Sequence, residues 1–371
     1  MSARLRGIAR DTEAIVAAGS YRASDGREVS LAAAVEAARA GTRMTGPDPV
    51  PVPSTEGAPP VGRGVGQGVG HRVGPSVGQG VEPSVEPQVG HRGEPSVGQR
   101  VEPSVEQGVG QRVESPVGQG VGRRVESPVG QGVGHWVESP VGQGVGRRVQ
   151  SSVEPHVGPC LEVTGESSLE AARRLAHAPV AVLNFASARN PGGGYLNGAQ
   201  AQEEALCRAS ALYACLLEAR GFYDHHRAHR DPFYSDRVIH SPAVPVFRDD
   251  RGRLLDEPWT AGFLTAAAPN AGVVLRTAPE RAAELPRALA VRAERVLETA
   301  AAHGYRRLVL GAWGCGVFRN DPAQVAGAFR TLLGPGGRFE RTFQHVVFGV
   351  LDRTPGQTVL GAFRRAFQVQ P

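Results

Sequence analysis

Apolar residues follow two spacings along this chain, and together they predict strands that alternate with helices in its C-terminal part. Short runs of neighbouring apolar residues are typical of buried strands, and the run Val-Ala-Val-Leu-Asn-Phe is the clearest example. Apolar residues three or four positions apart predict helices. This alternation predicts the α/β class, with helices on both faces of a mixed sheet. The predicted strands are residues 161–164, 179–185, 237–239, 262–267, 307–310 and 345–351, and the longer predicted helices are residues 278–302 and 323–333.

Local signals predict two further helices in this part of the chain. Ser167 and Glu170 have the spacing of a capping box and precede an apolar stretch, so a helix is expected to begin there. A second helix is expected after a Gly-rich loop. One stripe of that helix would contain Leu206, Ser210, Tyr213 and Leu217.

The N-terminal part of the chain has two separate helical patterns. Ile8, Ile15 and Val16 lie at helical spacing, and a run of helix formers from Leu31 to Arg39 ends at Gly41. These patterns predict two short helices.

A four-residue repeat of the form Val-Gly/Glu-x-x follows, from Val61 to Val157. Every fourth residue is Val except Gly93, and the later part resolves into twelve-residue units. Gly and Pro in nearly every tetrad oppose a helix, and one Val in four residues buries too little surface to offset the entropy lost on ordering. We therefore predict a disordered, largely extended linker. The alternative is a repetitive solenoid, although β-helix repeats carry several apolar residues per turn.

Composition and charge narrow the classes of protein and of partner. The chain has 49 Gly and 29 Pro, too many for packed domains alone. Its net charge of +5 favours anionic partners such as nucleotides or phosphorylated molecules. None of the four Cys forms a C-x-x-C pair or has a Cys/His zinc spacing, so reduced thiols are expected. With no apolar run of 18 residues and no signal-peptide core, we predict a cytoplasmic protein that does not bind membranes.

The segment from Asn184 to Glu204 carries the first candidate site. Gly192, Gly193 and Gly194 follow a predicted buried strand and precede a predicted helix. Glycine N–H groups can approach a phosphate or a ribose without a Cβ in the way, and the end of the helix adds a partial positive charge. The segment is neither a P-loop nor a G-x-G-x-x-G fingerprint. On the glycines alone, a tight loop without a ligand is an equally good interpretation.

Two neighbouring acids at the start of the predicted helix strengthen the case for a ligand. Successive helical residues point about 100° apart, so Glu203 and Glu204 would present their carboxylates to different parts of one ligand. One can hold a sugar hydroxyl while the other transfers a proton. The alternative is that both acids only complement the helix dipole.

This segment resembles the signature of the bacterial-type poly(ADP-ribose) glycohydrolases, in which three glycines and a short spacer precede Gln-Glu-Glu. The resemblance covers Cys160 to about Gln368 and, more weakly, Met1 to Pro53. It implies a macrodomain-like fold, with Glu204 as the catalytic acid and Glu203 as a residue that positions the ribose.

A second Gly-rich loop, within residues 308–322, also leads from a predicted strand into a predicted helix. It resembles the macrodomain loop that wraps a diphosphate, with Val317 and Phe318 closing over the ligand. We predict that the two loops bind substrate together. The predicted substrate-binding residues are Asn190, Gly192, Gly193, Gly194, Gln202, Gly314, Cys315, Gly316, Val317 and Phe318.

The resemblance implies hydrolysis of ribose–ribose glycosidic bonds, with release of ADP-ribose. In this scheme Glu204 protonates the leaving oxygen and then activates water, and neither a metal nor a cofactor is required. The expected partners are poly(ADP-ribose) or an ADP-ribosylated protein, without direct readout of nucleic acid. The alternatives are a hydrolase of mono-ADP-ribosylated targets, a module that only binds ADP-ribose, and an interaction scaffold based on the repeat.

The resemblance also suggests how the chain is divided. We expect an N-terminal helical segment, residues 1–53, that packs on the catalytic domain, a disordered repeat linker, residues 54–158, and the catalytic domain itself, residues 159–371.

Other candidate groups have weaker support. Interleaved Arg residues disfavour a metal site among the histidines of residues 224–230, so a polar surface is the better interpretation. Cys315 between two glycines is interpreted as a small loop residue rather than a nucleophile. Asn184 and Asn190 either bind ribose hydroxyls or cap turns.

Overall fold

The computed structural model describes residues 2–52 and 159–368, which belong to one compact unit. The predicted repeat linker, residues 54–158, lies outside the described residues. The strands are β1 Ser20–Arg22, β2 Glu28–Ser30, β3 Arg43–Thr45, β4 Cys160–Thr164, β5 Val180–Phe185, β6 Val238–Arg248, β7 Leu254–Ala266, β8 Arg307–Gly311 and β9 His345–Gly349. The α-helices are α1 Ala3–Ala18, α2 Ala32–Gly41, α3 Ser168–Leu175, α4 Gln202–Ala209, α5 Leu212–Glu218, α6 Arg220–Ala228, α7 Ala271–Thr277, α8 Leu285–Ala302, α9 Pro322–Leu333 and α10 Thr358–Phe367, and two 3-10 helices are η1 Tyr195–Asn197 and η2 Pro279–Glu284.

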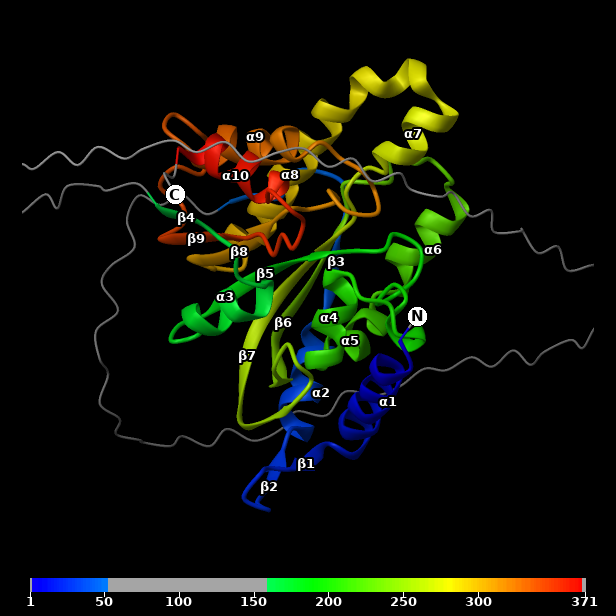
Figure 1. Ribbon diagram of the computed structural model, residues 1–371, viewed down its shortest axis with the longest axis vertical. Helices are drawn as coiled ribbons and strands as arrows, with labels where there is room; N and C mark the ends of the chain where they lie inside the picture. Colours follow the sequence, from blue (N-terminus) through cyan, green and yellow to red (C-terminus); the bar gives the residue numbers. More distant parts are fainter. Residues whose placement is uncertain (1, 53–158, 369–371) are drawn as a thin grey trace, which may run out of the picture. The chain divides into compact units, whose positions relative to one another are not determined.

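A mixed sheet of seven strands forms the centre of the described unit, in the order β3-β6-β7-β5-β8-β9-β4 (Figure 1). The five strands from β7 to β4 are parallel to one another, whereas β6 is antiparallel to both of its neighbours. Each strand predicted from the apolar runs has a counterpart in this sheet. The α/β class is confirmed, while the narrower macrodomain-like description stays a prediction.

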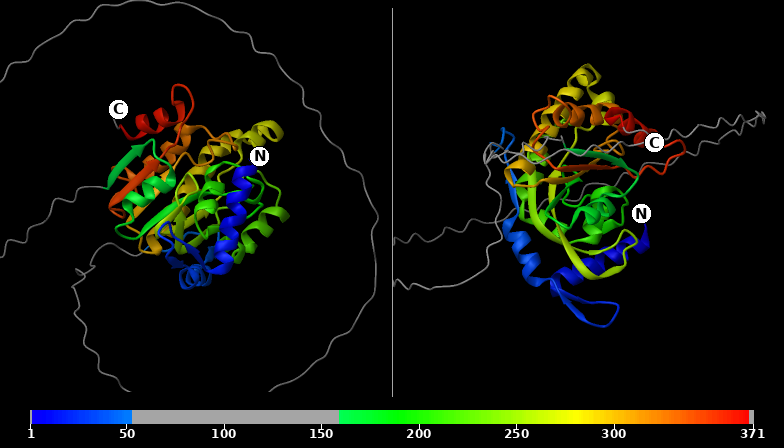
Figure 2. Two further views of the ribbon diagram at one scale, coloured as in Figure 1. Left: turned by 60° about the horizontal axis from the view of Figure 1, so that its bottom comes forward. Right: turned by 90° about the vertical axis from the view of Figure 1, so that its left-hand side faces the viewer.

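Helices cover both faces of the sheet because successive strand residues point in opposite directions. In β5, Val180 and Val182 belong to a core shared with α3, α4 and α5, whereas Ala181 and Leu183 belong to a second core with α8 and α9. Figure 1 shows α8, α9 and α10 on one side of the strands and α3, α4 and α5 on the other, and Figure 2 shows this separation from two more directions. Strand β5 is therefore buried on both faces, as its continuous apolar run predicted.

The predicted helix stripe around Ser210 is wrong, because the chain breaks there into α4 and α5. Ser210 has extended backbone, with φ −146° and ψ 176°, and its Oγ donates to the Leu206 carbonyl at 2.8 Å. It also forms an isolated bridge with Val246. Tertiary pairing with β6 thus overrides the helical spacing.

The hairpin of β6 and β7 is much longer than the strands predicted at 237–239 and 262–267. Its register shifts between Ser241 and Val244, and Ala243 within this bulge has a φ of +44°. Bulges and prolines interrupt the apolar alternation, so the apolar pattern predicts only one end of each strand. The helix predicted at 278–302 is likewise divided into η2 and α8.

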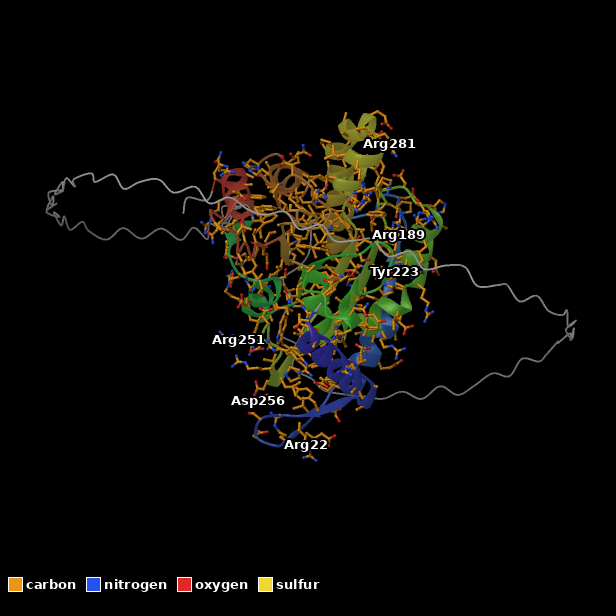
Figure 3. The ribbon with its side chains drawn as sticks, turned by 45° about the vertical axis from the view of Figure 1, so that its right-hand side comes forward. Arg22, Arg189, Tyr223, Arg251, Asp256 and Arg281 are labelled. Carbon is orange, nitrogen blue, oxygen red and sulfur yellow. The ribbon has the colours of Figure 1, made fainter. Side chains whose placement is uncertain are left out.

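The N-terminal residues form part of the same fold and add elements that were not predicted. The two expected helices are present as α1 and α2, while β3 pairs with β6 at the edge of the central sheet. The β1–β2 hairpin contacts the β6–β7 hairpin, since the Ser24 N–H donates to Asp256 Oδ1 at 2.7 Å. Figure 3 shows Arg22, Arg251 and Asp256 toward one end of the unit and Arg281 at the other. None of the helices in the described ranges is long and apolar enough to cross a membrane.

Candidate active site

A cavity of about 1050 Å³ opens at the carboxyl ends of the parallel strands. Loops that follow β5, β8 and β9 line it, together with the beginnings of α3 and α4. Ligands commonly bind at this edge of an α/β sheet, because the loops and the helix N-termini converge there. Both predicted Gly-rich loops reach this cavity.

The first loop holds its glycines in conformations that other residues rarely adopt. Gly192 and Gly193 have φ values of +66° and +59°. A Cβ on Gly193 would lie 2.5 Å from Glu204 Oε1 and 3.1 Å from Glu203 Oε2. Only glycine therefore lets the loop backbone lie against both carboxylates.

Glu203 is buried, and other residues hold both of its oxygens. Oε1 accepts from Asn184 Nδ2 at 3.2 Å, and Oε2 accepts from the Ser187 N–H at 2.7 Å. Asn184 Nδ2 also donates to Thr265 Oγ1 at 3.1 Å, which ties the contact to β7. Burial raises the pKa of Glu203 to about 8, against the opposing effect of these hydrogen bonds. The hydrogen bonds fix the Glu203 carboxylate, and burial keeps it out of contact with water.

Glu204 differs from Glu203 because one of its carboxylate oxygens has no hydrogen-bond partner among the described residues. Oε1 accepts from the Gly194 N–H at 2.8 Å. Oε2 is buried in the cavity wall and has no hydrogen-bond partner among residues 2–52 and 159–368. A buried carboxylate oxygen is costly without a partner, so this atom is suited to a ligand group.

Gln202 lines the cavity, but its amide is occupied by the protein. Its Oε1 accepts from the Phe185 N–H at 2.9 Å, and its Nε2 donates to the Leu183 carbonyl at 2.8 Å and to Ser168 Oγ at 3.0 Å. The amide thereby fixes the first turn of α4 to β5 and to α3. Because Glu203 and Glu204 follow directly in the same helical turn, their backbone positions are fixed as well.

The second loop, residues 312–321, is tied to the end of β7. Asn320 Nδ2 donates to the carbonyls of Pro269 and Gly314, at 2.8 and 3.1 Å. Gly314 has a φ of +71°, and a Cβ there would lie 2.5 Å from the Ala268 Cβ. At Gly316, by contrast, no described atom lies within 4 Å of the position of a Cβ. The loop is therefore held at its base and open at Gly316.

Two apolar residues of this loop stand at the mouth of the cavity. Val317 is 82% exposed, which is unusual for a large apolar side chain. The centroid of the Phe318 ring lies 5.7 Å from that of the Tyr234 ring. The backbone carbonyl of Phe318 accepts from the Gly272 N–H at 2.9 Å. Phe318 is thus held by contacts with Tyr234 and Gly272, whereas the Val317 side chain is exposed to solvent.

Comparison with known proteins identifies the family of this chain. The family model that matches is the catalytic domain of microbial-type PARG, over residues 9–249. The chain belongs to the microbial-type poly(ADP-ribose) glycohydrolases. A comparison with curated proteins gives no significant match.

Solved structures of this family resemble the chain over long stretches. The poly(ADP-ribose) glycohydrolase of Thermomonospora curvata is 36% identical, with a TM-score of 0.68, and the match covers 99% of this chain and 100% of that one. The same enzyme bound to the inhibitor ADP-HPD is 37% identical, with a TM-score of 0.66 and coverage of 98% and 99%. The Deinococcus radiodurans glycohydrolase in complex with ADP-ribose is 50% identical, with a TM-score of 0.55 and coverage of 57% and 86%.

Most residues predicted to bind substrate or to act in catalysis line this cavity. Gly192 is not among the described residues that line it. A Cβ there would lie 2.9 Å from a Tyr213 ring carbon and 3.3 Å from Cys207 Sγ, so Gly192 serves close packing behind the loop. The predicted residues that do line the cavity are Asn190, Gly193, Gly194, Gln202, Glu203, Glu204, Gly314, Cys315, Gly316, Val317 and Phe318.

The weaker candidates lie elsewhere or lack reactivity. His225 stacks on His229 along α6, and His226 Nε2 lies 2.8 Å from Ser235 Oγ. These rings are not among the described residues that line the cavity. Cys315 does line it, but burial raises the pKa of its thiol to about 12, which disfavours a thiolate.

Several residues that line or support the cavity could not be predicted from the sequence, because they come from distant elements. Asp250, in the turn between β6 and β7, lines the cavity, and its Oδ2 accepts from Ser167 Oγ at 2.5 Å. Leu5 of α1 and Arg353 beyond β9 also line it. Thr265, which supports Asn184, lies within an ordinary apolar strand. No local motif marks any of these residues.

Proposed function

We propose that this chain hydrolyses ribose–ribose glycosidic bonds in poly(ADP-ribose) and releases ADP-ribose, with Glu204 as the proton-transferring group. Membership of the microbial-type poly(ADP-ribose) glycohydrolases supports the reaction. The observation that carries the residue assignment is the buried Oε2 of Glu204, which has no partner in the described part of the chain and belongs to a residue that lines the cavity.

Glu204 would act first as an acid and then as a base. Its carboxyl group gives a proton to the ribose oxygen that leaves, while the bond from that oxygen to the anomeric carbon breaks. An oxocarbenium-like centre forms on the remaining ADP-ribose. The carboxylate then takes a proton from water, the hydroxide oxygen bonds to the anomeric carbon, and Glu204 returns to its starting form. One side chain is sufficient for both proton transfers.

Glu203 would position the ribose rather than transfer the proton. Asn184 and Ser187 fix its two oxygens at 3.2 and 2.7 Å, so its remaining lone pairs have set directions. A carboxyl group held in this way can select sugar hydroxyls at fixed distances from Glu204.

The two Gly-rich loops would bind the diphosphate. Gly193 and Gly316 both line the cavity, and the position of a Cβ at Gly316 is open, so a phosphate can approach the backbone there. The Gly193 N–H donates to the Asn190 carbonyl at 2.9 Å, so this glycine would offer close approach rather than a free donor. The α4 N-terminus favours negative charge. Val317 and Phe318 would cover the ligand and exclude water from the reacting centre. The proposed contact surface also includes Asn190, Gly194, Gly314 and Cys315. Gln202 would fix the start of α4, and Gly192 would let the first loop pack closely against Tyr213 and Cys207.

We further propose that residues 1–53 and 159–371 act together as the catalytic domain. Support comes from contacts between α1 and the site, since Tyr195 Oη donates to Glu13 Oε1 at 2.9 Å and Leu5 lines the cavity. An ADP-ribosylated protein as polymer carrier, a cytoplasmic location and the absence of nucleic-acid readout stay predictions.

The deciding experiment measures release of free ADP-ribose from purified polymer by the wild type, Glu204→Gln and Glu203→Gln. Loss of a general acid typically costs about 10²- to 10⁴-fold in rate, so Glu204→Gln should lose turnover while it still binds ADP-ribose. Glu280→Gln, an exposed acid of η2, is the matched control and should behave as wild type.

Two outcomes would contradict the proposal. Turnover of a mono-ADP-ribosylated protein without turnover of polymer would identify a hydrolase of mono-modified targets. Tight binding of ADP-ribose by the wild type without turnover of either substrate would identify a module that only binds.

A further inference from the structure

A group of side chains that can bind a metal lies at the β4 edge of the central sheet, which is the edge opposite β3. Cys160 and Glu162 belong to β4, and His345 is the first residue of β9. Cys160 pairs with His345 in the parallel register, and residues two apart on a strand point to the same face. The donor atoms of all three residues lie within 4.8 Å of one another.

We propose that Cys160, Glu162 and His345 form a binding site for a zinc-type divalent cation. Thiolate, imidazole and carboxylate are the ligands that Zn²⁺ takes in proteins, whereas Mg²⁺ and Ca²⁺ require oxygen ligands. The Cys160 sulfur lies 3.9 Å from Glu162 Oε1, and His345 Nε2 lies 2.5 Å from the same oxygen. The shorter separation is that of a hydrogen bond. Metal binding would replace this hydrogen bond, and the two atoms would move apart to the edge of roughly 3.3 Å that zinc bonds of about 2.0–2.1 Å to nitrogen and oxygen require.

The side of Glu162 that faces away from the cluster is already fixed. Arg174 Nη2 lies 2.7 Å from Glu162 Oε2 and 3.0 Å from Glu166 Oε2. This leaves Oε1 directed at the Cys–His pair, and hydrogen bonding of the outer oxygen is typical of carboxylates that bind metals. Arg174 is thus a supporting group rather than a ligand.

The ligand charges suit a divalent ion. Glu162 and Glu166 carry two negative charges, and two positive charges come from Arg174 and from Arg307, which pairs with His345 in the register of β8 and β9. A thiolate at Cys160 and the Glu162 carboxylate together would neutralise a divalent cation. The thiol is exposed, so a water molecule can take a fourth ligand position.

Binding exchanges a proton for the metal. The Cys160 S–H bond breaks, its proton goes to solvent, and the thiolate sulfur bonds to the cation, with no change of oxidation state. The affinity is therefore expected to increase with pH.

The expected consequence is a link between neighbouring strands at the sheet edge. The metal would join the first residue of β4 to the first residue of β9. A ligand that binds only the folded state stabilises it in proportion to its concentration and affinity. Zn²⁺ should therefore raise the melting temperature of the chain, and a chelator should reverse the increase.

The test uses the full chain, freed of metal with a chelator and kept reduced with a phosphine. Zn²⁺ binding is measured by calorimetry, and Co²⁺ serves as a spectroscopic probe through its thiolate charge-transfer absorption. Cys207 and Cys215 are buried and Cys315 is half-buried in the cavity wall, so Cys160→Ser is needed to assign thiolate absorption to Cys160. We expect one ion per chain and a thiolate–cobalt band.

Variants separate this site from other histidines and thiols. Cys160→Ser should abolish the cobalt band, and His345→Gln should weaken binding by at least the roughly 10- to 100-fold that loss of a supporting residue costs. Arg174→Gln should weaken it by about tenfold. His177→Gln, an exposed histidine outside the cluster, is the matched control and should bind as wild type.

Three results would overturn the proposal. They are an unchanged Zn²⁺ affinity in Cys160→Ser, a cobalt spectrum without thiolate absorption in the wild type, and no saturable binding at micromolar concentrations of metal. The melting temperature of each variant in chelator establishes that it is folded, so a loss of binding cannot arise from unfolding.

Discussion

The Gly193 backbone lies so close to Glu204 that a single added carbon would touch the carboxylate, with a Cβ 2.5 Å from Oε1. The next residue, Gly194, donates its N–H to this same oxygen at 2.8 Å. The loop therefore fixes one oxygen of Glu204 and leaves the other, which is buried, without a partner among the described residues. This relationship explains why the glycines and the acids occur together, since neither set positions a reacting group alone.

Gly193→Ala should lower kcat/KM by about 100-fold or more, because a displacement of about 1 Å at a catalytic group has that effect. The positive φ adds strain of about 1–3 kcal/mol to the folded state. Polymer hydrolysis and chemical denaturation measure the two effects. Gly327→Ala, in α9 with open space around its Cβ, is the control and should keep full activity. Full activity in Gly193→Ala would show that the loop does not position Glu204.

Glu203→Gln should become more stable relative to wild type as the pH increases from about 4.5 to about 8. The folded-state pKa of Glu203 is raised to about 8 from 4.5, so the folded state holds a proton that the unfolded state releases in this range. Wild-type stability therefore falls across the range, at up to about 1.4 kcal/mol per pH unit, and the amide is free of this effect. Denaturant unfolding at several pH values gives the difference, and a constant difference would contradict burial as the cause.

Thr12→Val should cost about 1–3 kcal/mol, because it leaves buried polar groups without partners. Thr12 Oγ1 donates to the Arg208 carbonyl at 2.8 Å and accepts from Arg248 Nε at 3.0 Å. The free energy of unfolding measures this link between α1 and the central sheet. Thr331→Val, which loses an exposed contact within α9, should stay within about 0.5 kcal/mol of wild type.

Val317→Asp should weaken ADP-ribose binding by about tenfold with little change in stability. Two unit charges at contact distance repel by about 1 kcal/mol even in water, and the 82% exposure of Val317 means that little packing is lost. Calorimetric titration with ADP-ribose measures the effect. Leu275→Asp, at a 55% exposed position outside the cavity lining, is the control. An equal affinity in the two variants would exclude the diphosphate from this loop.

Element positions could be predicted where the determining signal was local. The capping box of Ser167 and Glu170 begins α3 in the structure, with both reciprocal hydrogen bonds present. Strand β5 followed from its apolar run. The helix predicted across Ser210 was wrong, because the competing signal was pairing with Val246, a residue 36 positions later in the chain. A helical spacing carries no information about such a partner.

The sequence by itself determined the α/β class, the two Gly-rich loops and the adjacent acids Glu203 and Glu204, because apolar periodicity and short motifs are properties of neighbouring residues. Only the tertiary structure decided which partners these groups have. Asn184 meets Thr265 and Glu203, and Cys160 meets His345, because strands far apart in the chain pair in one register. That register depends on how both hydrophobic cores pack against the sheet, a property of the whole chain rather than of any segment.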